Sequence, residues 1–212
     1  MKDLPKFIDA LRSLAKADAS LQVTTNQETG EALLAGMGEL HLEITTYRIE
    51  EEQKIKVKVS EPIVVYREAI NGNNVDQPFE GKSPNRHNRF YIEVEMLPQN
   101  VIDALRSGDF RDGTIRNKDQ KEIGDQFAEL GMDKDMMRKG YAINGTNVFI
   151  NGTKGIQGLH ETRELLIEGF NEVCKAGPLA GEPAMGMLVR LTDANLHEDA
   201  IHRARAQTIP AM

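Results

Sequence analysis

The amino-acid sequence predicts an α+β fold built from two α/β sandwich modules. Across the 212 residues, segments with helical apolar periodicity alternate with segments in which apolar and polar residues alternate strictly. Residues 4–15 and 159–176 show the first pattern, typical of amphipathic helices, and residues 90–96 show the second, typical of a half-buried strand. Pro62 interrupts strand pairing and divides the chain into modules at residues 1–61 and 62–212.

The first module is predicted to follow the order helix, strand, strand, helix, strand. These elements are expected at residues 4–15, 21–25, 31–35, 40–52 and 55–59. Asp3 is the expected N-cap, Pro5 lies in the first helical turn, and residues 26–30 are expected to turn the chain. A ferredoxin-like split βαβ unit has one more strand in front. We therefore expect that the first strand is missing and that residue 1 lies inside a longer protein.

The second module is predicted to contain more strands and one long helix. Strands are expected at residues 63–67, 90–96, 147–150 and 185–191, a turn at 71–74, and short helices joined by loops over 98–140. The long helix at residues 159–176 is expected to end at Gly177 in the C′ position. The last strand leads into the segment that contains His202.

Composition indicates a soluble, cytoplasmic protein. The chain is 40% apolar and 28% charged, and its only cysteine is Cys174, so no internal disulfide is possible. No apolar run is long enough to span a bilayer, and the first residues lack the apolar stretch of a signal peptide. A net charge of −7 argues against a general nucleic-acid binder.

Two short basic loops nevertheless suit contact with RNA at one place. Residues 82–90 carry three positive charges and no acid, and residues 200–212 carry Arg203 and Arg205 and no acid. Guanidinium groups pair with phosphate in a directional, bidentate way. The alternative is that both loops are simply solvated, as short basic loops usually are.

Several motifs that would indicate other chemistry are absent or misplaced. No phosphate-binding loop of the form G-x-x-x-x-G-K-[ST] exists, so the chain is not expected to bind GTP by itself. His197 and His202 are five residues apart and would not share one helical face, which argues against a metal site. Two Asn-Gly pairs, at residues 144–145 and 151–152, are expected to be turns flanking a strand. His41 has no recognisable partner.

Four runs distributed over the chain carry a family resemblance. They are residues 35–43 (AGMGELHLE), 61–68 (EPIVVYRE), 82–89 (KSPNRHNR) and 199–203 (DAIHR). The first two closely resemble the third domain, and the entry to the fourth, of translocating elongation factors. The last two resemble the tip loops of the archaeal and eukaryotic branch, elongation factor 2. As a set these motifs are highly specific, although each alone would be modest.

The resemblance implies that the chain contains most of the third and fourth domains of a five-domain factor. The fourth domain would have the fold of a small-subunit ribosomal protein, including a rare left-handed βαβ crossover, an exception to the usual handedness. GTP and Mg²⁺ would bind only in the GTPase domain of the parent protein. This fragment is thus expected to hold no cofactor or metal and to be no enzyme itself.

The resemblance also assigns the site. His202 would be converted to diphthamide by diphthamide-synthesis enzymes and, with Arg203, Arg205, Arg86, His87, Arg89 and Lys82, would contact RNA. Asp199, Gln207 and Pro84 would support the loops. The implied partners are the ribosome at the small-subunit decoding region, tRNA and mRNA. The chain is expected to be a monomer that binds no membrane.

One departure from the family pattern concerns the loop after His202. Family members usually have glycine after His-Arg, then glycine or proline, whereas this chain has Ala204 and Arg205. Glycine permits backbone angles that alanine resists, so the loop is expected to bend differently. Three alternatives remain open: a paralogous ribosome-binding factor with an unmodified loop, a small-molecule phosphate-handling enzyme using His202 as an acid–base group, and a structural adaptor.

Overall fold

The structure is a computed structural model that describes residues 4–26, 31–62, 64, 66–75 and 77–212. The chain consists of two compact units, residues 1–65 and residues 66–212. Both mix helices and strands, which confirms the predicted α+β class. In the described part of the chain, no helix is long and apolar enough to cross a membrane.

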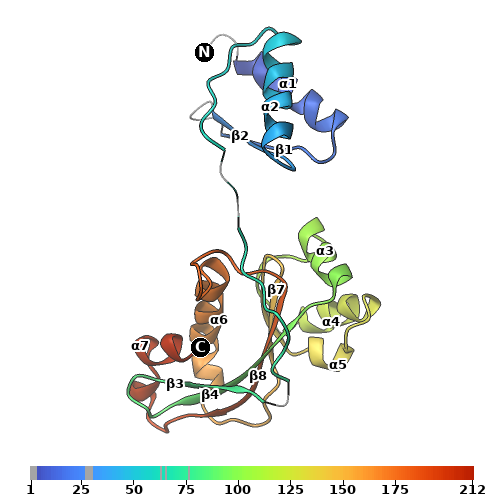
Figure 1. Cartoon of the computed structure of the whole chain (residues 1–212). Coiled ribbons are helices and arrows are strands. Elements are labelled where there is room, and N and C mark those ends of the chain that lie inside the picture. The colour runs from blue at the N-terminus through green and yellow to red at the C-terminus, as the bar shows by residue number, and fades with distance from the viewer. Residues whose placement is uncertain (1–3, 27–30, 63, 65, 76) are drawn as a thin grey trace. The chain divides into compact units, whose positions relative to one another are not determined.

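Unit 1 places two helices beside a two-stranded antiparallel sheet. In chain order its elements are α1 (Leu4–Ala17), β1 (Gln22–Asn26), β2 (Glu31–Ala35) and α2 (Glu39–Glu51) (Figure 1). Val23 faces Leu34 across the two strands. The core is formed by the apolar side chains of α1 and by residues from the following segments, namely Ala10, Leu11, Leu14, Leu21, Ile49 and Ile55. The amphipathic pattern of the first helix thus predicted its buried side correctly.

The expected strand at residues 55–59 is wrong as an element, although its first residue is buried as predicted. Residues 54–62 belong to no strand in the structure. The Ile55 N–H donates to the Ile49 carbonyl at 3.4 Å, so local chain reversal takes the place of strand pairing there. The Asp3 cap and residues 27–30 of the expected turn lie outside the described residues.

His41 explains the glycine-rich signature at residues 35–43. Its Nε2 lies 2.9 Å from Asp18 Oδ2, and its Nδ1 accepts the Met37 N–H at 3.1 Å, so the expectation of no partner is wrong. A Cβ added to Gly36 would lie 2.7 Å from His41 Nδ1, which leaves room for glycine only. Hydrogen bonds from Ser20, and then from His41, hold the pKa of Asp18 below its usual value.

Unit 2 is built on a six-stranded sheet in the order β3-β4-β8-β7-β6-β5. Its strands are β3 (Phe79–Lys82), β4 (Arg89–Met96), β5 (Gly113–Thr114), β6 (Gly140–Asn144), β7 (Asn147–Asn151) and β8 (Met187–Asn195). β7 and β8 are parallel, and the other neighbouring pairs are antiparallel. The parallel pair is joined by the long helix α6 (Leu159–Lys175). The handedness of this βαβ crossover stays a prediction.

Each face of the sheet carries its own apolar core. On one face, α6 packs with Leu166 and Phe170 against Phe149 of β7. The other face is covered by α3 (Gln99–Ser107), α4 (Gln120–Glu129) and α5 (Lys134–Met137) (Figure 1). The core on that side includes Phe127 and Ile150. Burial on both sides explains why β7 reads as a continuous apolar run rather than an alternation.

Three strands, β3, β5 and β6, were not predicted from the sequence, and the strand expected at residues 63–67 is not seen at its described residues. β3 is mostly exposed and has no apolar alternation, while β6 is buried at four successive residues and so lacks a period of two. Residues 64, 66 and 67 are in no strand, and Ile63 and Val65 of that expected strand lie outside the described residues. Glu68, just after this segment, forms an isolated bridge with Ala184.

The prediction that Gly177 occupies the C′ position after the long helix is confirmed, whereas the turn predicted at Gly152 is wrong. α6 ends at Lys175 with Ala176 as its C-cap, so Gly177 is the C′ residue, although its φ is not positive. Gly177 also makes room for Glu68, because an added Cβ would lie 2.3 Å from Glu68 Cδ. That carboxylate accepts the N–H of Ala180 at 2.8 Å and further N–H groups nearby, which hold the pKa of Glu68 below its usual value. Gly152 makes no turn and donates to the Leu191 carbonyl at 2.8 Å.

Candidate functional site

Two loops meet at one edge of the unit 2 sheet. The first, residues 83–88, joins β3 to β4. The second, residues 196–204, follows β8 and contains the short helix η1 (Ala200–Arg203), which leads into α7 (Arg205–Thr208). β4 and β8 are antiparallel neighbours, with Arg89 opposite Asn195. The start of β4 and the end of β8 therefore lie together, and this register brings the two predicted basic loops side by side.

Asparagine and glutamine side chains bind the two loops to each other. The His202 carbonyl accepts from Asn88 Nδ2 at 2.7 Å and from Asn85 Nδ2 at 3.2 Å. Gln207 Oε1 accepts the Asn85 N–H at 2.8 Å, which gives Gln207 a part in joining the loops. Sequence reasoning did not single out Asn85 and Asn88, because their partners lie more than a hundred residues away in the chain.

Three imidazole rings gather between the loops. The ring centroids of His87 and His202 are 4.8 Å apart, those of His197 and His202 are 4.4 Å apart, and those of His87 and His197 are 5.0 Å apart. His87 is exposed, while His197 and His202 are half-buried. Sequence reasoning dismissed His197 because of its helical spacing to His202, but His197 lies in a loop after β8, where helical spacing does not apply. Among the described residues, no cluster of His, Cys, Asp or Glu could hold a metal ion.

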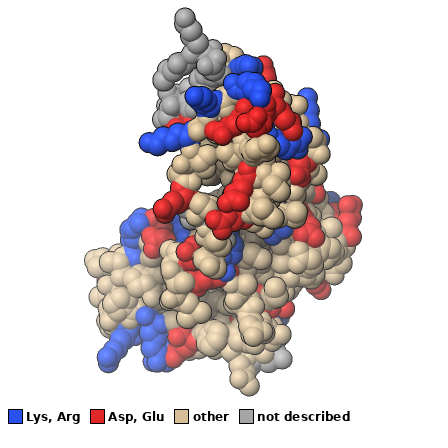
Figure 2. Space-filling view, turned by 45° about the horizontal axis from the view of Figure 1, so that its top comes forward, with Lys and Arg blue, Asp and Glu red and all other residues tan. Residues whose placement is uncertain are grey.

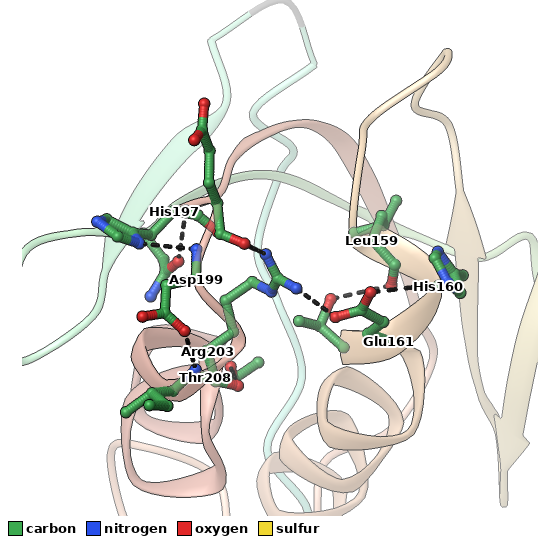
Figure 3. A network of polar contacts seen from close by, with 11 residues as sticks. Leu159, His160, Glu161, His197, Asp199, Arg203 and Thr208 are labelled. Carbon is green, nitrogen blue, oxygen red and sulfur yellow. Dashed lines mark hydrogen bonds and ion pairs between the residues drawn. The ribbon is translucent and has the colours of Figure 1, made fainter.

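Arg203 points into the protein rather than toward solvent. It is only 8% exposed, and its Nη1 donates to the carbonyls of His197 at 2.5 Å and Glu198 at 2.9 Å. Its Nη2 forms an ion pair with Glu161 of α6 (Figure 3). Its own carbonyl accepts from Thr208 Oγ1 at 2.9 Å. The predicted phosphate contact is therefore not available from this side chain, which joins the loop to α6.

The two residues that depart from the family pattern fit the loop without strain. Ala204 has φ −64° and ψ 165°, which alanine adopts freely, so the expected change in bending does not arise from this residue. Arg205 forms an ion pair with Glu168 of α6 and lies 3.7 Å from Glu172. Arg205 thus faces two carboxylates on α6 instead of adding free charge. Asp199 caps η1 and accepts the Ile201 N–H at 3.1 Å, as a loop-supporting residue would.

The first loop and the strand residues that flank it present three exposed cations, Lys82, Arg86 and Arg89. Arg86 is exposed at the tight turn, where its φ is +61°, and no ion pair is found for it among the described residues. Lys82 and Arg89 both lie near Glu80, at 2.8 Å and 3.3 Å. The hydrogen bond from Lys82, above all, holds the pKa of Glu80 below its usual value. Pro84 is exposed within the same loop.

Surface charge elsewhere is mixed. On the face shown in Figure 2, Lys and Arg side chains interleave with Asp and Glu side chains and form no continuous basic area. This agrees with the net charge of −7. In the second loop, the apolar side chain of Ile201 is 77% exposed.

Comparison with known proteins identifies both units. Residues 1–61 match the family described as Elongation Factor G, domain III, and residues 112–212 match Elongation factor G, domain IV. The chain is 55% identical over 209 residues to elongation factor 2 of Picrophilus torridus and 54% identical over 209 residues to that of Thermoplasma volcanium. It is 53% identical over 212 residues to that of Halomicrobium mukohataei.

These matches cover nearly all of this chain, between 99% and 100%, but only 28% of each relative. The similarity is therefore continuous across both units, and the chain spans about 28% of the length of these relatives. The chain belongs to the elongation factor 2 family, of the archaeal type, and corresponds to domains III and IV of the elongation factor G family.

Proposed function

We propose that this chain is the part of a translation elongation factor that contacts ribosomal RNA through the two loops of unit 2. The observation that carries the proposal is the gathering of His87, His197 and His202 from loops more than a hundred residues apart. Imidazole rings can stack on unpaired bases and donate hydrogen bonds to phosphate. An exposed cation, Arg86, lies in the same loop as His87.

The arginines have different roles from those expected from the sequence, because only some of them are placed to contact phosphate. Arg86 is an exposed phosphate contact for which no ion pair is found among the described residues, whereas Lys82 and Arg89 are partly neutralised by Glu80. Arg203 instead braces the His202 loop, and Arg205 fastens α7 to α6. A few cations on two loops give a small, position-specific attraction to RNA rather than general affinity, because each phosphate contact releases its own counterions.

The finer assignments follow from the family. We propose that the loops enter the decoding region of the small subunit, next to tRNA and mRNA, during translocation. GTP and Mg²⁺ would bind in the remainder of the whole protein, which would act in the cytoplasm as a monomer. The role of this part is steric and electrostatic, with no bond made or broken by its residues.

His202 is proposed to carry diphthamide. Its backbone carbonyl is fixed by Asn85 and Asn88, so a group built on the ring would start from a defined position. We expect the tryptic peptide of residues 191–203, from protein purified from its native host, to show a mass increase confined to His202. A peptide of unmodified mass would contradict the modification and favour a paralogous factor that binds the ribosome with an unmodified loop.

A further inference from the structure

The side chain of Asn88 is buried between the two loops and forms hydrogen bonds with both. It is 0% exposed, and both ends of its side-chain amide are used. Nδ2 donates to the His202 carbonyl at 2.7 Å and to Ser83 Oγ at 3.3 Å. Oδ1 accepts the His197 N–H at 3.1 Å. A fully buried amide with all of these bonds made has one orientation and little freedom to change it.

These bonds close the segment from His197 to His202 around a single side chain. The amide holds the first N–H of the segment and its last carbonyl. From the opposite side, Arg203 donates to the His197 carbonyl, so the backbone at His197 is held at both its N–H and its C=O. Asn88 is the last residue of the first loop and immediately precedes β4, so it holds the segment close to the start of a strand of the sheet.

We propose that Asn88 is a positioning residue that sets the orientation of the His202 ring against His87 and His197. The backbone of residue 202 determines where its ring can lie, and Asn88 provides the shorter of the two side-chain bonds to that carbonyl. Because Asn88 lies in the chain next to His87, a displacement of the first loop is transmitted to His202. Its importance for RNA contact rests on the proposed function, whereas its effect on the His202 ring does not.

Two substitutions separate positioning from simple packing. Asn88→Ala removes both the donor and the acceptor. Asn88→Asp keeps the acceptor for the His197 N–H, but an ionised carboxylate places a negative oxygen where the His202 carbonyl needs a donor. Burial raises the pKa of an aspartate, and the protonated acid can again donate one hydrogen bond. Acidification should therefore restore the Asn88→Asp variant and leave the Asn88→Ala variant unchanged.

The test uses the whole chain and the imidazole resonances of His87, His197 and His202, recorded by NMR between about pH 5 and pH 8 and compared with wild type at each pH. We expect displaced resonances in Asn88→Ala at every pH. In Asn88→Asp they should be displaced at high pH and return to wild-type positions at low pH. Asn100→Ala is the matched control, because it also removes a hydrogen bond from a side-chain amide to a carbonyl, that of Leu130 at 2.8 Å, but lies on α3 and not in either loop.

Binding to small ribosomal subunits separates this inference from the proposed function. Loss of one buried hydrogen-bonding amide is expected to weaken binding about tenfold in Asn88→Ala and not in Asn100→Ala. Unchanged histidine resonances in Asn88→Ala, or Asn88→Asp spectra that never return to wild type, would overturn the positioning role. Wild-type protein that does not bind small subunits, with the expected NMR changes intact, would overturn the proposed function and leave the positioning role standing.

Discussion

Replacement of Arg203 by alanine is expected to lower the free energy of unfolding of unit 2 by about 2 kcal/mol. The guanidinium is 8% exposed and supplies donors to two backbone carbonyls as well as to Glu161. Its removal leaves those carbonyls without their donor and also removes the packing of its apolar stem. Arg203→Lys is expected to recover only part of the loss, because one ammonium cannot reproduce the planar fork that reaches all three acceptors.

Arg205→Ala is the matched control for Arg203. It removes the same charge two residues further along the chain, but the Arg205 side chain is 64% exposed, so its ion pairs are expected to contribute less than about 0.5 kcal/mol. Amide hydrogen exchange of β8 in mild denaturant measures both variants within the whole chain, without requiring the two units to unfold together. Equal effects of the two substitutions would show that Arg203 does not brace the loop.

Replacement of Gly81 by alanine is expected to destabilise unit 2 by about 2 to 3 kcal/mol. An added Cβ on Gly81 would lie 1.9 Å from the carbonyl oxygen of Ala211 and 3.0 Å from its carbonyl carbon. Both are backbone atoms of the short helix η2 (Ile209–Ala211), and Ala211 is itself buried at 3% exposure, so no side-chain rotation can relieve the overlap. η2 would have to move away from β3.

Gly81→Ala should also change the arrangement of the two loops that form the candidate site. β3 leads into the first loop, and η2 follows the His202 loop and α7, so the substitution separates the supports of both loops. Lys82→Ala, on the exposed neighbouring residue, provides the control and should change the free energy of unfolding by less than about 0.5 kcal/mol. Thermal unfolding of unit 2 indistinguishable between wild type and Gly81→Ala would contradict the close approach of η2 to β3.

Elements with one buried and one exposed face were predictable from the sequence. Elements that are buried throughout or mostly exposed were not. α1 and α6 each bury one face and expose the other, so their apolar spacing reveals both type and orientation. The alternation of β4 also predicted a strand, although Glu93 is buried and Met96 is 50% exposed. β6 is buried at four successive residues, which removes the alternation, and β3 is mostly exposed, which removes the apolar signal. The segment from Ile55 had the alternation of a strand but found no pairing in the described structure.

The site was predictable in its parts but not in its internal arrangement. Residue types and motifs indicated both loops, and the register of β4 with β8 explains why the loops meet. Which arginine faces outward could not be predicted, because the direction of Arg203 depends on Glu161, which lies 42 residues away on α6. The same holds for Asn88, whose acceptor on His202 is 114 residues distant and which carries no charge or periodic pattern.

The most direct measurement is the affinity of the chain for archaeal small ribosomal subunits between about 50 and 200 mM salt. The account predicts binding that weakens with salt, with a smaller salt slope for Arg86→Glu and an unchanged slope for Lys121→Glu, which alters an exposed cation on α4. Absence of binding at the lowest salt, or an identical loss of slope in both variants, would contradict the proposal that these two loops form an RNA-contacting site.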